Sequence, residues 1–114
     1  MKISEENRVN FTILDIEGQL NAITCHELEK RLNSLLDKGE KQFLLNLSGL
    51  DYISSAGLRV LLVAAKKLKS CNGQIVLASL KDQVRKVFDT AGFSGFFPMF
   101  DTREDALQNF LGRY

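Results

Sequence analysis

Short, almost wholly apolar runs alternate along the chain with longer segments in which apolar residues repeat at helical spacing. The strand-like runs are residues 1–5, 8–17, 43–47 and 74–78, with 96–100 as either a short strand or an apolar loop. The helix-like segments begin near Thr24, Ser54, Ser79 and Thr102. Strands that alternate with helices pair mainly in parallel through right-handed crossovers. The pattern therefore predicts one α/β domain over residues 1–114, with a mainly parallel, mixed sheet of four to five strands and about four helices. The first strand is expected at an antiparallel edge.

The boundaries of the first elements carry distinct local signals. The apolar alternation changes phase at Ile13-Leu14, which indicates either a bulge or burial on both faces, and Gly18 is expected to end that strand. The run from Thr24 to Glu27 matches a capping box at a helix start. The residues expected to face the core from the four helices are Leu28, Leu32, Leu35 and Leu36, then Leu58, Leu61, Leu62, Ala65 and Leu68, then Val84, Val87, Phe88 and Ala91, and last Ala106, Leu107, Phe110 and Leu111.

Charge and composition argue against several classes of partner. Fifteen Lys and Arg face fourteen Asp and Glu, so the formal charge of +1 gives no reason to expect nucleic acid or a membrane surface. Cys25 and Cys71 are far apart in the sequence and are expected to be reduced thiols. The N-terminus lacks a signal-peptide core, and the longest apolar run, 60–65, is too short to cross a bilayer. We expect a soluble, cytoplasmic protein without a cofactor.

Two adjacent serines, Ser54 and Ser55, lie where a strand-like run gives way to a helix-like one. Serine is among the best N-cap residues, so one of the two is explained if Ser54 caps the helix. Gly57 needs another explanation, since glycine inside a helix costs about 1 kcal/mol relative to alanine. Either another group approaches the backbone closely at Gly57, or the helix packs tightly on a strand. The sequence alone leaves both explanations open.

The serines lack the neighbours that catalysis would require. The motif I-S-S-A-G differs from the G-x-S-x-G elbow of hydrolases, and Leu58 stands where an S-x-x-K motif after Ser55 would have lysine. The single histidine, His26, lies in the expected capping box and is interpreted as a surface residue. One histidine and two dispersed cysteines make a poor set of metal ligands, and no glycine-rich phosphate loop occurs. We therefore expect a protein that is not an enzyme, with no catalytic or metal-binding residues.

A helix start is a favourable place for a phosphate. Free backbone N–H groups and the positive end of the helix dipole favour an anion there. Phosphorylation of Ser55 would add roughly −1.5 to −2 charges and three strong acceptor oxygens at that position. The folded domain could carry this group with little rearrangement, and a docked partner would feel the change most.

The segment Asp51–Leu61 resembles the phosphorylation motif of the bacterial anti-sigma factor antagonists, which belong to the STAS domain family. The resemblance extends over essentially the whole chain, through residues 18–22, 43–48 and 87–93. It implies a partner switch in which the unmodified antagonist binds an anti-sigma factor that is also a GHKL-type serine kinase. Phosphorylation by that kinase releases the antagonist, and a PP2C-type phosphatase resets it. By position, Ser55 is the phosphate acceptor and Ser54 a less favoured one.

Two positions depart from the pattern of that family: Ser54 and Asn21 stand where many members carry aspartate. Both departures remove an acid beside the acceptor. Because the carboxyl ends of parallel strands share one edge of a sheet, the turn at 18–23, a loop at 48–55 and the turn at 79–81 are expected to lie together. The residues expected to bind a partner there are Asn21, Ala22, Ser54, Ser55, Gly57, Leu58 and Arg59. Leu58 is expected to lie mainly in the core, and Arg59 to point outward.

Other roles within the family stay open at this point. The chain could be an unphosphorylated STAS subunit of a lipid-transport complex or of a larger stress-signalling assembly. The same switch could also control secretion or a surface behaviour instead of a sigma factor. The sequence leaves the oligomeric state open as well.

Overall fold

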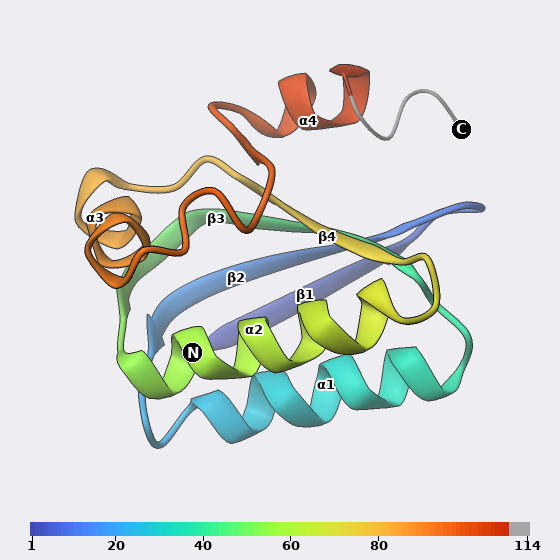
Figure 1. Ribbon diagram of the computed structural model, residues 1–114, viewed down its shortest axis with the longest axis horizontal. Helices are drawn as coiled ribbons and strands as arrows, with labels where there is room; N and C mark the ends of the chain where they lie inside the picture. The colour runs from blue at the N-terminus through green and yellow to red at the C-terminus, as the bar shows by residue number, and fades with distance from the viewer. Residues whose placement is uncertain (110–114) are drawn as a thin grey trace.

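The fold is built on a five-stranded mixed sheet with the strand order β1-β2-β3-β4-β5 (Figure 1). The computed structural model describes residues 1–109. The strands are β1 (Lys2–Asn7), β2 (Thr12–Leu20), β3 (Gln42–Ile53), β4 (Gln74–Ala78) and β5 (Met99–Phe100). The helices are α1 (Cys25–Asp37), α2 (Ser55–Lys69), α3 (Asp82–Ala91) and α4 (Arg103–Asn109). β1 pairs antiparallel with β2 and all other neighbours pair in parallel, which confirms the predicted α/β class and the antiparallel edge.

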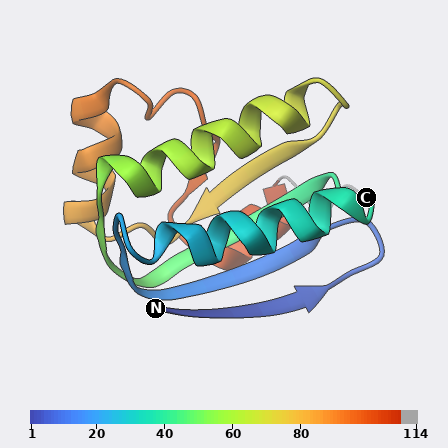
Figure 2. The ribbon, with the colours of Figure 1, turned by 90° about the horizontal axis from the view of Figure 1, so that it is seen from below.

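Helices lie on both sides of the sheet (Figures 1 and 2). The apolar side chains that α1, α2 and α3 bury belong to a larger core on one side of the sheet. α4 covers a smaller core on the other side. Successive side chains of β3 alternate between the two: Phe43 and Leu45 belong to the larger core, and Leu44 to the smaller core with Ala106 of α4. The prediction of a central strand buried on both faces at 43–47 is therefore confirmed.

β3 is longer than the sequence pattern predicts. Residues 48–53 were expected to form a loop, but the strand continues to Ile53. Leu50 and Ile53 are buried in the larger core, and this part of β3 pairs with the end of β2. Burial and strand pairing together outweigh the loop-forming residues of the segment. The serine pair consequently follows a strand directly.

Gly18 does not end β2, contrary to the prediction. It lies inside the strand at a φ of +101°, a backbone conformation that favours glycine. Two shifts in the pairing of β2 with β3 occur within residues 15–20. Ile13 and Leu14 are paired without a shift, are fully buried, and belong to the smaller and larger cores respectively. The change of apolar phase there reflects burial on both faces.

The capping box predicted at the start of α1 is not formed. Thr24 has helical dihedral angles (φ −80°, ψ −19°), and its side chain makes no capping hydrogen bond to α1. Its hydroxyl instead donates to the carbonyl oxygen of Gln19 at 2.7 Å and accepts from the N–H of Asn21 at 2.9 Å. Thr24 therefore ties together the turn that precedes α1.

Three expectations near the C-terminal end have different outcomes. Ala91 is exposed and not inward, because α3 ends there and Gly92 follows with a left-handed φ of +80°. The run 96–100 does contain a short strand, β5. Phe110 and Leu111, expected on the apolar face of the last helix, lie outside the described residues.

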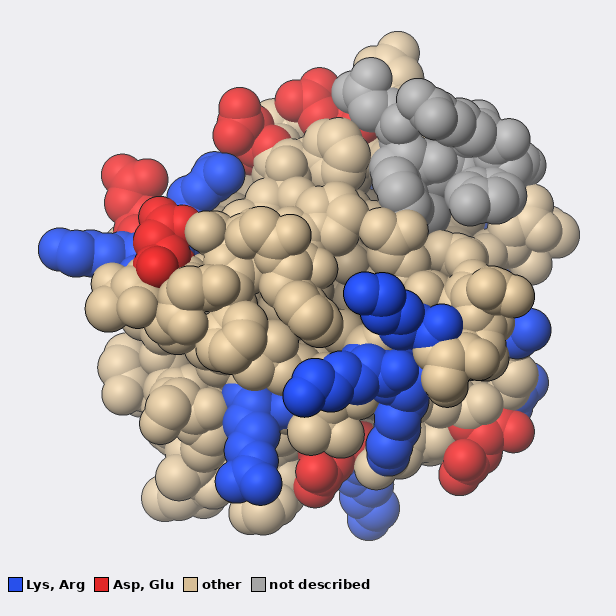
Figure 3. Space-filling model, viewed as in Figure 1, with Lys and Arg blue, Asp and Glu red and all other residues tan. Residues whose placement is uncertain are grey.

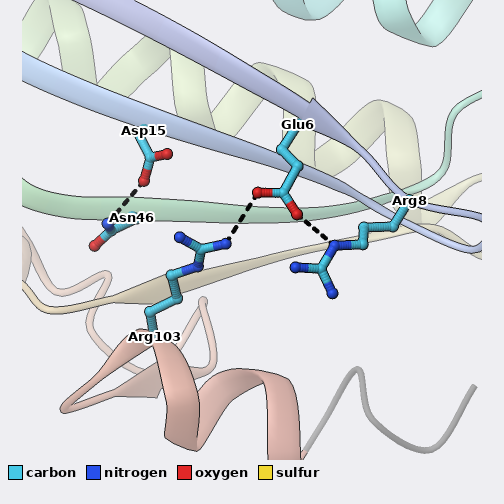
Figure 4. Close-up of polar contacts among 5 residues, drawn as sticks. All are labelled: Glu6, Arg8, Asp15, Asn46 and Arg103. Atoms are coloured by element: carbon cyan, nitrogen blue, oxygen red, sulfur yellow. Dashed lines mark hydrogen bonds and ion pairs between the residues drawn. The ribbon is translucent and has the colours of Figure 1, made fainter.

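Charged side chains connect β1, the β1–β2 turn and α4 (Figure 4). The Glu6 carboxylate accepts a hydrogen bond from Arg8 Nε and another from Arg103 Nη2, the latter at 3.1 Å. The hydrogen bond from Arg8, helped by the positive charges of both arginines, lowers the pKa of Glu6 below its ordinary value of 4.5. Nearby, Asn46 Nδ2 donates to Asp15 Oδ1 at 2.7 Å and joins β3 to β2.

Candidate functional site

The start of α2 is capped by Ser54. This residue has extended dihedral angles (φ −92°, ψ 171°), and its Oγ accepts a hydrogen bond from the N–H of Gly57 at 3.2 Å. Its own N–H donates to the carbonyl oxygen of Leu20 at 2.9 Å. The prediction that Ser54 is the N-cap is confirmed, and both bonds hold its side chain and backbone in the fold.

Ser55 has different surroundings. It is the first residue of α2 and is exposed, and its hydroxyl makes no hydrogen bond with any residue in 1–109. The first turn of α2 contains no acidic residue. The N–H groups of Ser55 and Ala56 have no helical acceptors, because the first N–H groups of any helix lack them. Ser55 therefore presents a free hydroxyl at an electropositive helix end.

Gly57 is explained by packing. A Cβ built on Gly57 would lie 2.7 Å from Leu20 Cγ and 2.8 Å from the Leu20 carbonyl oxygen, closer than real contacts allow. Of the two explanations that the sequence left open, the structure thus favours tight packing of the helix on a strand. Gly57 and Leu58 are both buried, with Leu58 only 4% exposed. The expectation that Leu58 lies mainly in the core is confirmed, whereas a role of either residue in binding a partner stays a prediction.

The turn before α1 is organised by Asn21. Its Oδ1 accepts hydrogen bonds from the N–H groups of Ile23, at 2.9 Å, and Thr24, at 3.0 Å. An aspartate at this position would offer the same acceptor oxygen, so the asparagine keeps the local geometry without the negative charge. Asn21 is half-buried, and Ala22 beside it is exposed.

The segments predicted to share one edge of the sheet do so. The hydrogen bond from Ser54 N–H to Leu20 joins the start of α2 to the turn before α1. An ion pair between Lys81 and Asp51 joins the start of α3 to the end of β3. Figure 1 shows the first turns of α1 and α2 at the same end of the molecule. The site is therefore assembled from three segments that are far apart in the sequence.

A groove of about 520 Å³ runs between the first halves of α1 and α2, next to this edge. The residues that line it are Ala22, Cys25, His26, Glu29, Ser55, Ala56, Arg59, Val60 and Val63. Exposed apolar side chains occur in the groove and next to it in the chain: Val63, which lines the groove, is 41% exposed, and Ile23, which follows Ala22, is 84% exposed. Sequence reasoning missed six of the lining residues: Cys25, His26, Glu29, Ala56, Val60 and Val63. Their signal was present, because 25, 26 and 29 in α1 and 56, 59, 60 and 63 in α2 each repeat with helical spacing.

Basic groups dominate the surface of α2. Arg59 is exposed and makes no ion pair with any residue in the described part of the chain. Lys66, Lys67 and Lys69 occupy the last turn, where they complement the helix dipole. Figure 3 shows basic side chains gathered over the C-terminal half of α2. In the groove itself, His26 Nδ1 lies 3.8 Å from Glu29 Oε1.

Residues 1–109 contain neither a cluster of metal ligands nor a membrane-spanning helix. Within 1–109, no group of three or more His, Cys, Asp or Glu is arranged to hold a metal ion. Over the same residues, no helix is long and apolar enough to cross a membrane.

The STAS domain family matches residues 2–106, and the chain belongs to this family. It is 42% identical over 110 residues to BtrV of Bordetella bronchiseptica, a protein assigned as an anti-sigma factor antagonist, with 96% of this chain and 95% of BtrV covered. The resemblance stated from the serine motif is thereby confirmed at the level of the family. Anti-sigma factor antagonists are binding proteins, which agrees with the prediction that the chain is not an enzyme.

Solved structures agree with the fold. The anti-sigma factor antagonist SpoIIAA in its unphosphorylated form superimposes with a TM-score of 0.85 at 19% identity, covering 97% of both chains. The phosphorylated form of SpoIIAA from Bacillus superimposes with a TM-score of 0.76 at 20% identity, covering 95% of this chain and 98% of that one. These likenesses establish a shared STAS architecture.

Proposed function

We propose that the chain is an anti-sigma factor antagonist whose binding to its partner is controlled by phosphorylation of Ser55. The observation that carries the proposal is that, within the described residues, the hydroxyl of Ser54 is hydrogen-bonded and the hydroxyl of Ser55 is not. Ser54 is held by the capping bond to Gly57, whereas the Ser55 hydroxyl is exposed and unbonded within residues 1–109. A kinase can reach Ser55 without disturbing the helix start, so Ser55 is the favoured acceptor over Ser54.

The relatives support this assignment. BtrV shares the class of anti-sigma factor antagonist, and SpoIIAA, of the same fold, has been solved with and without phosphate. The partners that we propose are an anti-sigma factor of the GHKL serine kinase type and a PP2C-type phosphatase. All of them would act in the cytoplasm of a bacterial cell.

The partner would dock on the exposed part of the site. We assign Asn21, Ala22, Ser54, Ser55 and Arg59 to this surface, and add the exposed Ile23 and Val63 beside the groove. Apolar side chains provide area that a partner can bury. Arg59 provides a charge that can select an acidic residue of the partner.

Phosphate on Ser55 would oppose docking through charge and desolvation. It brings roughly −1.5 to −2 charges into the centre of this surface. An unpaired anion buried in an interface costs several kcal/mol. Moving a population from 1:99 to 99:1 requires about 5.5 kcal/mol of differential binding, which is within reach of such a group.

The test is a phosphosite map of the protein recovered from its own cells, with Ser54 and Ser55 resolved by fragmentation mass spectrometry. We expect phosphate on Ser55, its loss in Ser55→Ala, and its retention in the matched variant Ser54→Ala. Ser55→Ala should also keep the partner bound when ATP is added to the purified pair. Absence of phosphate under both growth and stress would refute the switch and favour the unphosphorylated subunit of a larger assembly.

A further inference from the structure

The groove holds a cation that makes no hydrogen bond or ion pair within the described residues. Arg59 is exposed, lines the groove together with Ser55, and has no hydrogen bond or ion pair with residues 1–109. The other arginines of the described chain, Arg8, Arg31, Arg85 and Arg103, all make ion pairs. A free guanidinium at this position is therefore available to a group that the unmodified domain lacks.

The helix geometry brings Arg59 to Ser55. The two residues are four positions apart on α2, so their Cβ atoms are neighbours on one face, about 5–6 Å from each other. Side chains on an α-helix tilt toward its N-terminus, so the long side chain of Arg59 extends over the turn that carries Ser55. An anion attached to Ser55 Oγ would lie within reach of the guanidinium.

We propose that Arg59 binds the phosphate of phosphorylated Ser55, so that the modification changes the state of Arg59 on the docking surface. The inference rests on the proposed function, because it takes Ser55 as the acceptor. A guanidinium presents paired N–H donors that match two phosphate oxygens, and the free N–H groups of the first turn of α2 add to them. Phosphorylation then acts twice on the docking surface: it adds an anion, and it withdraws the cation that would otherwise meet the partner.

Two titratable groups of α1 also face the groove. His26 and Glu29 contact each other at 3.8 Å, and both line the same space as Ser55 and Arg59. A protonated His26 would attract the phosphate, and the Glu29 carboxylate would repel it. Arg59 differs from both because its charge is permanent at any pH at which the domain is folded.

The experiment uses protein in which phosphoserine is incorporated at position 55 during synthesis, so no kinase is needed. A ³¹P NMR titration gives the second pKa of the phosphate, which is about 6 for phosphoserine in a free chain. We expect a lower phosphate pKa in the folded protein than in an unfolded peptide of residues 51–62. Arg59→Gln should raise the phosphate pKa by about half a unit or more.

Lys66→Gln is the matched control. It removes the same charge from the same helix, but about 16 Å from Ser55 along the helix axis, beyond the Debye length of about 8 Å at physiological salt. We expect no change in the phosphate pKa for this variant. Equal shifts in the two variants, or no shift in Arg59→Gln, would overturn the proposal.

A second readout reports contact directly. In the phosphorylated protein the Arg59 Nε–H resonance should move as the phosphate titrates, and it should stay fixed when Ser55 is unmodified. A resonance that does not follow the phosphate would overturn the proposal even if the phosphate pKa were shifted. Because the phosphate is installed during synthesis, a failure of this test is separate from a lack of Ser55 phosphorylation in cells, which would refute the switch itself.

Discussion

Gly57 of α2 lies directly against Leu20, the last residue of β2. A Cβ on Gly57 would come within 2.7 Å of Leu20 Cγ and 2.8 Å of its carbonyl oxygen. That same carbonyl accepts the hydrogen bond from Ser54 N–H. One residue of β2 thus fixes both the cap and the first turn of α2. The position of Ser55, between the two contacts, is set by this packing.

Gly57→Ala is expected to destabilise the domain by about 1–3 kcal/mol, because the added methyl group overpacks against a backbone atom. The higher helix propensity of alanine offsets only part of this loss. Gly95→Ala is the control, since nothing lies within 4 Å of a Cβ built there. Urea unfolding should show a change within about 0.5 kcal/mol for Gly95→Ala. Equal losses in both variants would contradict the packing argument.

Ser54→Ala is expected to lose about 1 kcal/mol of stability, because it removes the capping bond to the N–H of Gly57. Ser55→Ala should be nearly neutral, since its hydroxyl has no hydrogen bond within residues 1–109. Thermal unfolding of the two variants, measured in one buffer, makes the comparison. The assignment of the cap to Ser54 fails if Ser55→Ala is the more damaging change.

Asn21→Asp is expected to fold with nearly unchanged stability, because a carboxylate accepts the same two bonds from Ile23 and Thr24 N–H. Asn21→Ala should cost about 1 kcal/mol, since both N–H groups lose their acceptor. Chemical denaturation of the three proteins measures this difference. A stable Asn21→Ala protein would show that the turn does not depend on the side chain.

Glu6 gives the domain a pH dependence of known sign. Its pKa is lowered in the folded state by Arg8 and Arg103, so its contribution is present above pH 4.5 and is lost as the pH falls through the folded-state pKa. Glu6→Gln should therefore lower Tm at neutral pH, and the Tm values of wild type and variant should converge below pH 4.5. Asp37→Asn, at an exposed carboxylate, is the control. A gap in Tm that stays constant down to low pH would exclude this role for Glu6.

Much of the fold was predictable because apolar spacing distinguishes strands from helices in this chain. The cap at Ser54 was predictable because serine at a strand-to-helix junction has few other structural uses. The length of β3 was not, since Ser48 and Gly49 signal a loop, and the strand stays extended through pairing with β2 and burial of Leu50 and Ile53. The capping box failed because the Thr24 hydroxyl is used within the preceding turn, where it accepts from Asn21 N–H and donates to the Gln19 carbonyl.

The groove was missed for a different reason. The apolar spacing of each helix predicts only the face that is buried in the core. The side chains that line the groove lie at the margins of two such faces. His26 and Val63 come together only when α1 and α2 pack side by side. A comparison of the margins of both helical patterns could have found them, because the two helices start at the same edge of the sheet.

Ser54 caps α2 while Ser55 is exposed, and this division of roles has a consequence for protein turnover. A cell removes proteins largely through their rare unfolded molecules, so a change that costs 1–2 kcal/mol alters abundance several-fold. Because the cap belongs to Ser54, a phosphate on Ser55 breaks no capping bond of the fold, and proteases would not clear the phosphorylated form faster than the unmodified one. The same molecules could then be phosphorylated and dephosphorylated many times without being replaced by new synthesis.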